Sequence, residues 1–144
     1  MQKITTFLTY NDQAVEAAEL YVSIFRDGKI TSTMPGPNGG VMAVNFELFG
    51  QAFVALNGGP SFSFSEGISL FVGCESQAEI DDLWAKLTRG GGSEGRCGWC
   101  TDKFGVSWQI VPNALPRLLN GPKAFQAMMG MNKLDIAALE AAGK

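Results

Sequence analysis

The first residues of the chain change from a strand-like to a helix-like hydrophobic pattern. Residues 4–10 (ITTFLTY) are β-branched and aromatic, which is typical of a strand. From residue 13 to residue 25 the apolar side chains recur at helical spacing, which predicts a helix with one buried face. Asn11 and Asp12 precede this range, and we expect them to cap the helix.

Three more strands are predicted before residue 60. They cover residues 30–34, 41–48 and 51–56. The last two are separated only by Phe49-Gly50, which indicates a hairpin. Glycine and proline in residues 35–40 predict the loop before that hairpin.

The same order of patterns then returns. Residues 68–74 predict a strand, and Ser76 is placed to cap a helix over 77–87. Residues 97–101 and 105–111 predict a second hairpin. The remaining residues, 113–144, predict only helices, at 114–119, 122–129 and 134–142.

An internal repeat relates the two halves. A shift of 64 places residues 4–8 on 68–72, and a shift of 55 places 49–53 on 104–108. Each half therefore has the order βαβββ. The predicted fold class is α+β, with module one at about 1–60, module two at about 67–112 and a C-terminal helical extension at 113–144. We expect one domain over 1–144.

Composition excludes several kinds of chemistry. The 144 residues hold no histidine, so triads and metal sites built on imidazole are excluded. The net charge is −3 and no basic cluster occurs, which argues against a nucleic-acid partner. No apolar stretch is long enough to span a membrane. The start of the chain lacks the pattern of a secretory leader, and we expect a cytoplasmic protein with reduced thiols.

Paired βαβββ modules resemble the vicinal oxygen chelate superfamily, to which glyoxalase I and bleomycin resistance proteins belong. Four strings are similar to its PhnB-like, or demethylubiquinone 3-methyltransferase-like, group: LNGGP at 56–60, SLFVGC at 69–74, CGW at 97–99 and DKFGVSWQIVP at 102–112. The resemblance extends over nearly the whole chain, from about residue 4 to residue 142.

The resemblance implies a metal site that this chain does not furnish. Relatives take ligands from the first and last strand of each module, at positions that here hold Thr5 (or Ile4), Val54, Ser69 (or Ile68) and Gln109. Hydroxyls, one amide and a valine are poor ligands for a dication. Anionic ligands would have to come from elsewhere, the nearest candidates being Glu47, Glu66, Glu75 and Asp102, most of which we expect to be solvated. We therefore expect no metal and no cofactor.

The expected ligand-binding residues lie in the cleft that the resemblance implies. They are Thr5, Phe7, Val54, Ser69, Phe71, Trp99 and Gln109. The amide of Gln109 either orients a ligand or hydrogen-bonds backbone across the sheet. Phe7 and Phe71 could form apolar walls of the cleft, and core packing is expected for at least one of them. Strand alternation puts Trp108 in the core. Trp99 is expected either in the core or in contact with the ligand.

Cys97-Gly98-Trp99-Cys100 has the spacing of a redox dithiol or of half a zinc site. We expect packing or incidental thiols instead, because the segment leads into a strand and not into a helix N-terminus. A zinc site would also lack a fourth ligand, since only Cys74 remains.

The function that we expect is metal-free binding of a small molecule, by a chain that forms homodimers as relatives do. No catalytic residue is assigned. The alternatives are a lyase, isomerase or dioxygenase of the same superfamily, with a metal on unanticipated ligands, and the methyltransferase of the group's label. The chain lacks the glycine-rich strand-to-helix loop of the common methyltransferases.

Overall fold

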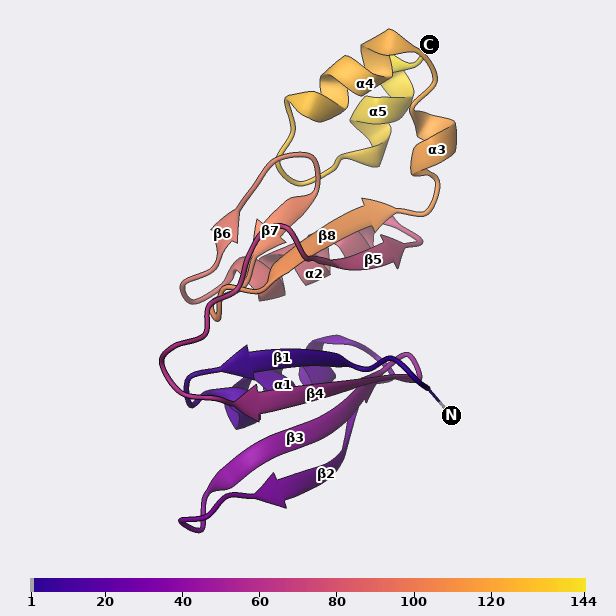
Figure 1. The fold of residues 1–144 in the computed structure, drawn as a ribbon. Helices are drawn as coiled ribbons and strands as arrows, with labels where there is room; N and C mark the ends of the chain where they lie inside the picture. The colour runs from indigo at the N-terminus through magenta and orange to yellow at the C-terminus, as the bar shows by residue number, and fades with distance from the viewer. Residues whose placement is uncertain (1) are drawn as a thin grey trace. The chain divides into compact units, whose positions relative to one another are not determined.

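Each half of the chain folds as a strand, a helix and three strands. The computed structural model describes residues 2–144, and the chain divides after Ser63 into two compact units. The first unit contains β1 (Thr6–Tyr10), α1 (Ala14–Ile24), β2 (Lys29–Pro35), β3 (Val41–Leu48) and β4 (Gln51–Asn57). Its sheet has the order β1-β4-β3-β2, in which only β1 and β4 are parallel neighbours (Figure 1).

The second unit repeats this topology. It contains β5 (Leu70–Cys74), α2 (Gln77–Thr88), β6 (Ser93–Glu94), β7 (Trp99–Thr101) and β8 (Ser107–Pro112), with the sheet order β5-β8-β7-β6. The two-residue strand β6 was not predicted, because it is too short to show an alternating pattern. The predicted α+β class with paired βαβββ modules is confirmed.

Strand register confirms the repeat residue by residue. Phe7 lies opposite Val54 in the first sheet, and Phe71 lies opposite Gln109 in the second. The two pairs are related by the shifts of 64 and 55 that the sequence predicts. Positions that match in the repeat therefore occupy the same place on the two sheets.

Each sheet buries one face against its own helix. In the first unit Tyr21 of α1 packs on Phe46, which stacks on Phe53 at 5.3 Å between ring centroids. In the second unit Trp108 and Ile110 are buried on the α2 side, so the prediction that Trp108 lies in the core is confirmed. The opposite face of each sheet carries more exposed side chains, such as Phe7 in the first unit and Phe71 and Gln109 in the second.

The two long helices are capped in different ways. Ser76 caps α2 as predicted, since its hydroxyl accepts a hydrogen bond from the Glu79 N–H at 3.1 Å. The predicted caps of α1, Asn11 and Asp12, are wrong. Asn57, at the end of β4, accepts from the Ala14 N–H at 2.8 Å and donates to the Val41 carbonyl.

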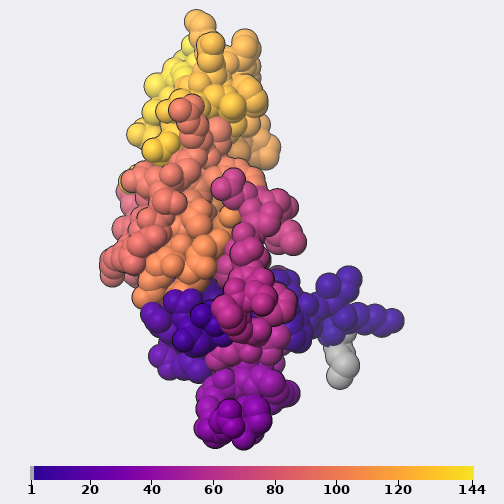
Figure 2. Space-filling model, turned by 60° about the vertical axis from the view of Figure 1, so that its left-hand side comes forward, coloured from indigo at the N-terminus to yellow at the C-terminus, as the bar shows by residue number. Residues whose placement is uncertain are grey.

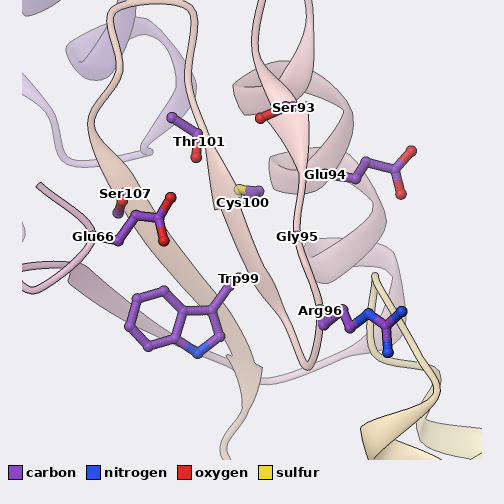
Figure 3. Close-up of a pocket in the computed structure, with 9 residues that line it drawn as sticks. All are labelled: Glu66, Ser93, Glu94, Gly95, Arg96, Trp99, Cys100, Thr101 and Ser107. Atoms are coloured by element: carbon purple, nitrogen blue, oxygen red, sulfur yellow. The ribbon is translucent and has the colours of Figure 1, made fainter.

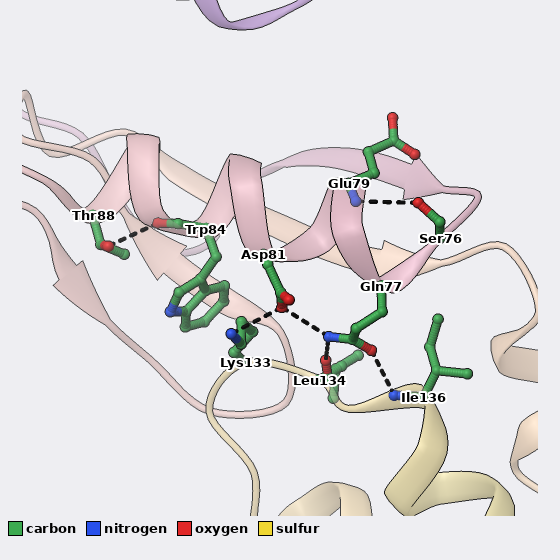
Figure 4. A network of polar contacts seen from close by, with 9 residues as sticks. All are labelled: Ser76, Gln77, Glu79, Asp81, Trp84, Thr88, Lys133, Leu134 and Ile136. Carbon is green, nitrogen blue, oxygen red and sulfur yellow. Dashed lines mark hydrogen bonds and ion pairs between the residues drawn. The ribbon is translucent and has the colours of Figure 1, made fainter.

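The C-terminal extension consists of α3 (Leu115–Leu118), α4 (Pro122–Met129) and α5 (Ile136–Ala142), close to the predicted ranges. These residues, orange to yellow in Figure 2, form one end of the second unit. Gln77 fastens the extension to α2: its amide donates to the Leu134 carbonyl at 3.0 Å and accepts from the Ile136 N–H at 2.8 Å (Figure 4). Lys133 pairs with Asp81 at 2.9 Å beside it, and lowers the pKa of that carboxyl.

Among residues 2–144, none of the helices is both long and apolar enough to cross a bilayer.

Candidate functional site

The open face of the second sheet brings three of the expected site residues into one row. Gln109 on β8 lies between Phe71 on β5 and Trp99 on β7, each in direct register with it. Directly opposed residues on neighbouring strands share a face, so the three side chains point the same way. Phe71 is 62% exposed and Trp99 is half-buried. The row offers an amide flanked by two aromatic rings.

Ser69 completes this row and resolves the register of the first-strand position. Its hydroxyl accepts a hydrogen bond from the Gln109 amide at 2.9 Å, whereas Ile68 is 76% exposed. Gln109 is therefore held by a side chain, and not by backbone across the sheet. Its amide oxygen accepts no hydrogen bond from the described residues, which leaves it open to a donor from outside the chain.

At the positions that the repeat relates to Phe71 and Gln109, the first sheet carries the less polar pair Phe7 and Val54. Phe7, which is 59% exposed, lies opposite Val54, and Val54 lies opposite Asn45. Asn45 donates to the Ser32 hydroxyl at 2.8 Å. Thr5 directly precedes β1 and is half-buried. The expectation that Phe7 or Phe71 packs in a core is wrong, because strand alternation directs both rings to the face away from the helix. Their role as walls of one cleft stays a prediction.

A pocket of about 320 Å³ adjoins the row in the second unit. Its lining comes from strands β6 to β8 and from the loop before β5 (Figure 3). Of the seven expected ligand-binding residues, Trp99 lines this pocket. Sequence reasoning missed Ser93, Thr101 and Ser107 as lining residues, and considered Glu66 only as a metal ligand. The alternation that sets Ser107 and Gln109 on one face was the signal that could have found Ser107.

The longest string shared with the family, residues 102–112, is built around a buried carboxylate. Asp102 is 2% exposed, which corrects the expectation of a solvated side chain. One carboxylate oxygen accepts from the N–H groups of Phe104 and Val106, and the other accepts from the indole N–H of Trp108 at 2.9 Å. Asp102 thus closes the β7–β8 turn and fixes the core tryptophan. The motif positions β8 and, with it, Gln109.

The donor set on the open faces does not fit a dication. Thr5, Val54, Ser69 and Gln109 supply no anionic oxygen, thiolate or imidazole. Asp102 is committed to three hydrogen-bond donors. In the described part of the chain, Cys, Asp and Glu side chains form no cluster of three that could hold a metal ion.

The cysteines lie in separate surroundings, and all three are free. Burial raises the pKa of the Cys100 thiol to about 12, with Asp102 adding to the effect, and burial likewise raises that of Cys74 to about 12. Neither forms the thiolate that redox exchange or zinc requires near neutral pH. The Cys97 sulfur lies 3.6 Å from that of Met129. These contacts support packing, and not a dithiol.

Two βαβββ modules, each with an open sheet face opposite its helix, define a protein of the glyoxalase and bleomycin resistance fold. A family model described as 3-demethylubiquinone-9 3-methyltransferase matches residues 2–111, and the chain belongs to this PhnB-like family. The matched region ends before α3, so it is shorter than the resemblance that the sequence shows.

Solved structures agree with this assignment. A putative 3-demethylubiquinone-9 3-methyltransferase, PhnB protein, from Bacillus cereus is 34% identical, with a TM-score of 0.71 over 77% of this chain and 99% of that one. Protein PA1353 from Pseudomonas aeruginosa is 22% identical, with a TM-score of 0.64 over 78% and 98%. A glyoxalase/bleomycin resistance protein from Albidiferax ferrireducens T118 is 13% identical, with a TM-score of 0.54 over 77% and 98%. The latter two show the fold alone. A comparison with curated proteins found no match.

Proposed function

We propose that this chain binds a small molecule on the open face of its second sheet, without a metal ion. The observation that carries the proposal is the row of Phe71, Gln109 and Trp99, in which the amide is oriented by Ser69. Small-molecule sites combine apolar and aromatic surface with a few fixed polar groups. The free amide oxygen of Gln109 is such a group, because the hydrogen bond from the amide NH₂ of Gln109 to Ser69 sets the direction of this oxygen.

The other expected contacts belong to the same proposal. Thr5, Phe7 and Val54 supply a more apolar surface at the matching positions of the first module. The chain acts as one glyoxalase-like domain in this proposal, as a homodimer in the cytoplasm. Its ligand is the small molecule alone, with no cofactor.

Methyl transfer, named in the family's description, is not part of the proposal. The common methyltransferases bind their cofactor at a glycine-rich turn of a doubly wound parallel sheet. Each sheet in the described residues has one parallel pair and is otherwise antiparallel. The lyase, isomerase and dioxygenase alternatives need a metal on unanticipated ligands, and the described residues hold no cluster of three Cys, Asp or Glu side chains for one.

A ligand titration by nuclear magnetic resonance tests the proposal. A panel of small metabolites is added to ¹⁵N-labelled protein. We expect each compound that binds to shift both the Trp99 indole signal and the Gln109 side-chain amide signal. The substitution Gln109→Leu should weaken their binding about tenfold, because one oriented hydrogen bond is lost. Chelator should not change the affinity.

Gln126→Leu is the matched control, because Gln126 is an exposed amide on α4. It should bind as the wild type does. Binding that shifts only signals outside the row, or that survives Gln109→Leu unchanged, would contradict the proposal.

A further inference from the structure

The pocket beside the row is lined by an aromatic ring and hydroxyls. Alternation along the strands sets Trp99, Thr101 and Ser107 on the open face, and Ser93 lies opposite Thr101 in register. Cys100, between two of these positions, points to the α2 side, where its thiol is buried. The floor of the pocket therefore consists of one indole and three hydroxyl groups.

Ser107 presents an unbonded hydroxyl to the pocket. The residue is 3% exposed and lines the pocket, and its hydroxyl makes no hydrogen bond within residues 2–144. The indole N–H of Trp99 likewise has no acceptor in the described chain, whereas that of Trp108 is bound to Asp102. Both groups can therefore form hydrogen bonds with polar atoms of a ligand in the pocket.

The charged side chain that points into the pocket is the acidic Glu66. In Figure 3 the carboxylate of Glu66 and the ring of Trp99 approach the same space from two sides, while the side chains of Glu94 and Arg96 extend away from it. Glu66 forms no ion pair or hydrogen bond with the described residues. A carboxylate and an indole ring that line one pocket can together attract an organic cation, and among aromatic rings the indole gives the strongest cation–π interaction.

We propose that this pocket seats the cationic group, an alkylammonium or quaternary ammonium, of the small molecule that the chain binds. The proposal rests on the proposed function and adds the chemical class of its ligand. Trp99 contacts the cation with its ring and Glu66 balances its charge. The hydroxyls of Thr101 and Ser107 bind polar substituents, and the remainder of the molecule extends along the row toward Gln109 and Phe71. A volume of about 320 Å³ accommodates such a group with its first substituents.

Choline and its neutral isostere, 3,3-dimethylbutan-1-ol, provide the test. The two probes differ in charge and hardly in shape. We expect choline to shift the Trp99 indole signal of ¹⁵N-labelled protein and to bind about tenfold more tightly than the isostere. The substitution Glu66→Gln should remove most of this preference and leave the affinity for the isostere unchanged. Added salt should weaken the choline interaction.

Glu75→Gln is the matched control, because Glu75 is exposed in the same unit and does not line the pocket. It should keep the preference for choline. Trp99→Leu should abolish choline binding, and dispersed indole signals of Trp84 and Trp108 would show that this variant is folded.

Equal affinity for the two probes, or a preference for choline that survives Glu66→Gln, would overturn the cation proposal. Neutral compounds that still shift Trp99 and Gln109 together would in that case leave the proposed function intact. Failure of every compound at this face would instead contradict the proposed function itself.

Discussion

Asp102→Ala should lower the free energy of unfolding by about 4 kcal/mol, the largest effect that we expect from a single substitution. The change leaves the N–H groups of Phe104 and Val106 and the indole N–H of Trp108 without their acceptor. The site is buried, so water cannot replace the carboxylate fully. Urea unfolding of both proteins measures the difference.

Asp102→Asn keeps the shape but presents an amide N–H₂ in place of one oxygen. It should cost about 2 kcal/mol, and it provides a measurement if the alanine variant does not fold. Asp82→Ala is the control: its carboxylate is exposed and pairs only with half-buried Lys86, so a change below about 0.5 kcal/mol in the free energy of unfolding is expected. A loss under about 1 kcal/mol in Asp102→Ala would contradict the structural role of the carboxylate.

Gly98→Ala should lower the free energy of unfolding by about 3 kcal/mol, because backbone strain and a steric clash add together. The backbone φ of Gly98 is +86°, which side chains of L-residues rarely adopt. An added Cβ would lie 2.9 Å from the Ile110 carbonyl oxygen and 3.0 Å from a methyl carbon of buried Leu134. The Cys97-Gly98-Trp99 string is thus explained by a tight turn against β8 and the C-terminal extension.

Gly50→Ala separates the two terms. The backbone φ of Gly50 is +77°, and an added Cβ would meet nothing within 4 Å. It should lose only about 1 kcal/mol, the cost of the left-handed backbone. Thermal or urea unfolding of both variants gives the comparison. Equal losses would show that close packing at Gly98 contributes nothing.

Element types could be predicted because each segment carries one clear period. The two strands around Phe49-Gly50 and the helical spacing in residues 77–87 both match the structure closely. The repeat shifts went further, since they related Phe7 to Phe71 and Val54 to Gln109, and these residues form matching pairs in the two sheets. The equivalence of the two positions followed from sequence, whereas the pairing of Phe71 with Gln109 came from the structure.

Features that depend on contacts between distant segments could not be predicted. Asn57 caps α1 from 43 residues away, and no local pattern announces such a cap. Asp102 was expected to be solvated, because the sequence does not show that the β7–β8 turn directs its carboxylate toward the indole of Trp108, six residues further on. The pocket lining was missed for the same reason: Glu66 reaches it from a loop whose path no periodicity describes.

We propose above that this member of the family binds its small molecule without a divalent metal. Elemental analysis of untagged protein, purified without chelator, is the decisive measurement, since a histidine tag would introduce a metal site of its own. We expect far less than one zinc, iron, nickel or manganese ion per chain, because Thr5, Val54, Ser69 and Gln109 offer no anionic ligand. One equivalent of any of these metals per chain would show that metal-free binding is wrong.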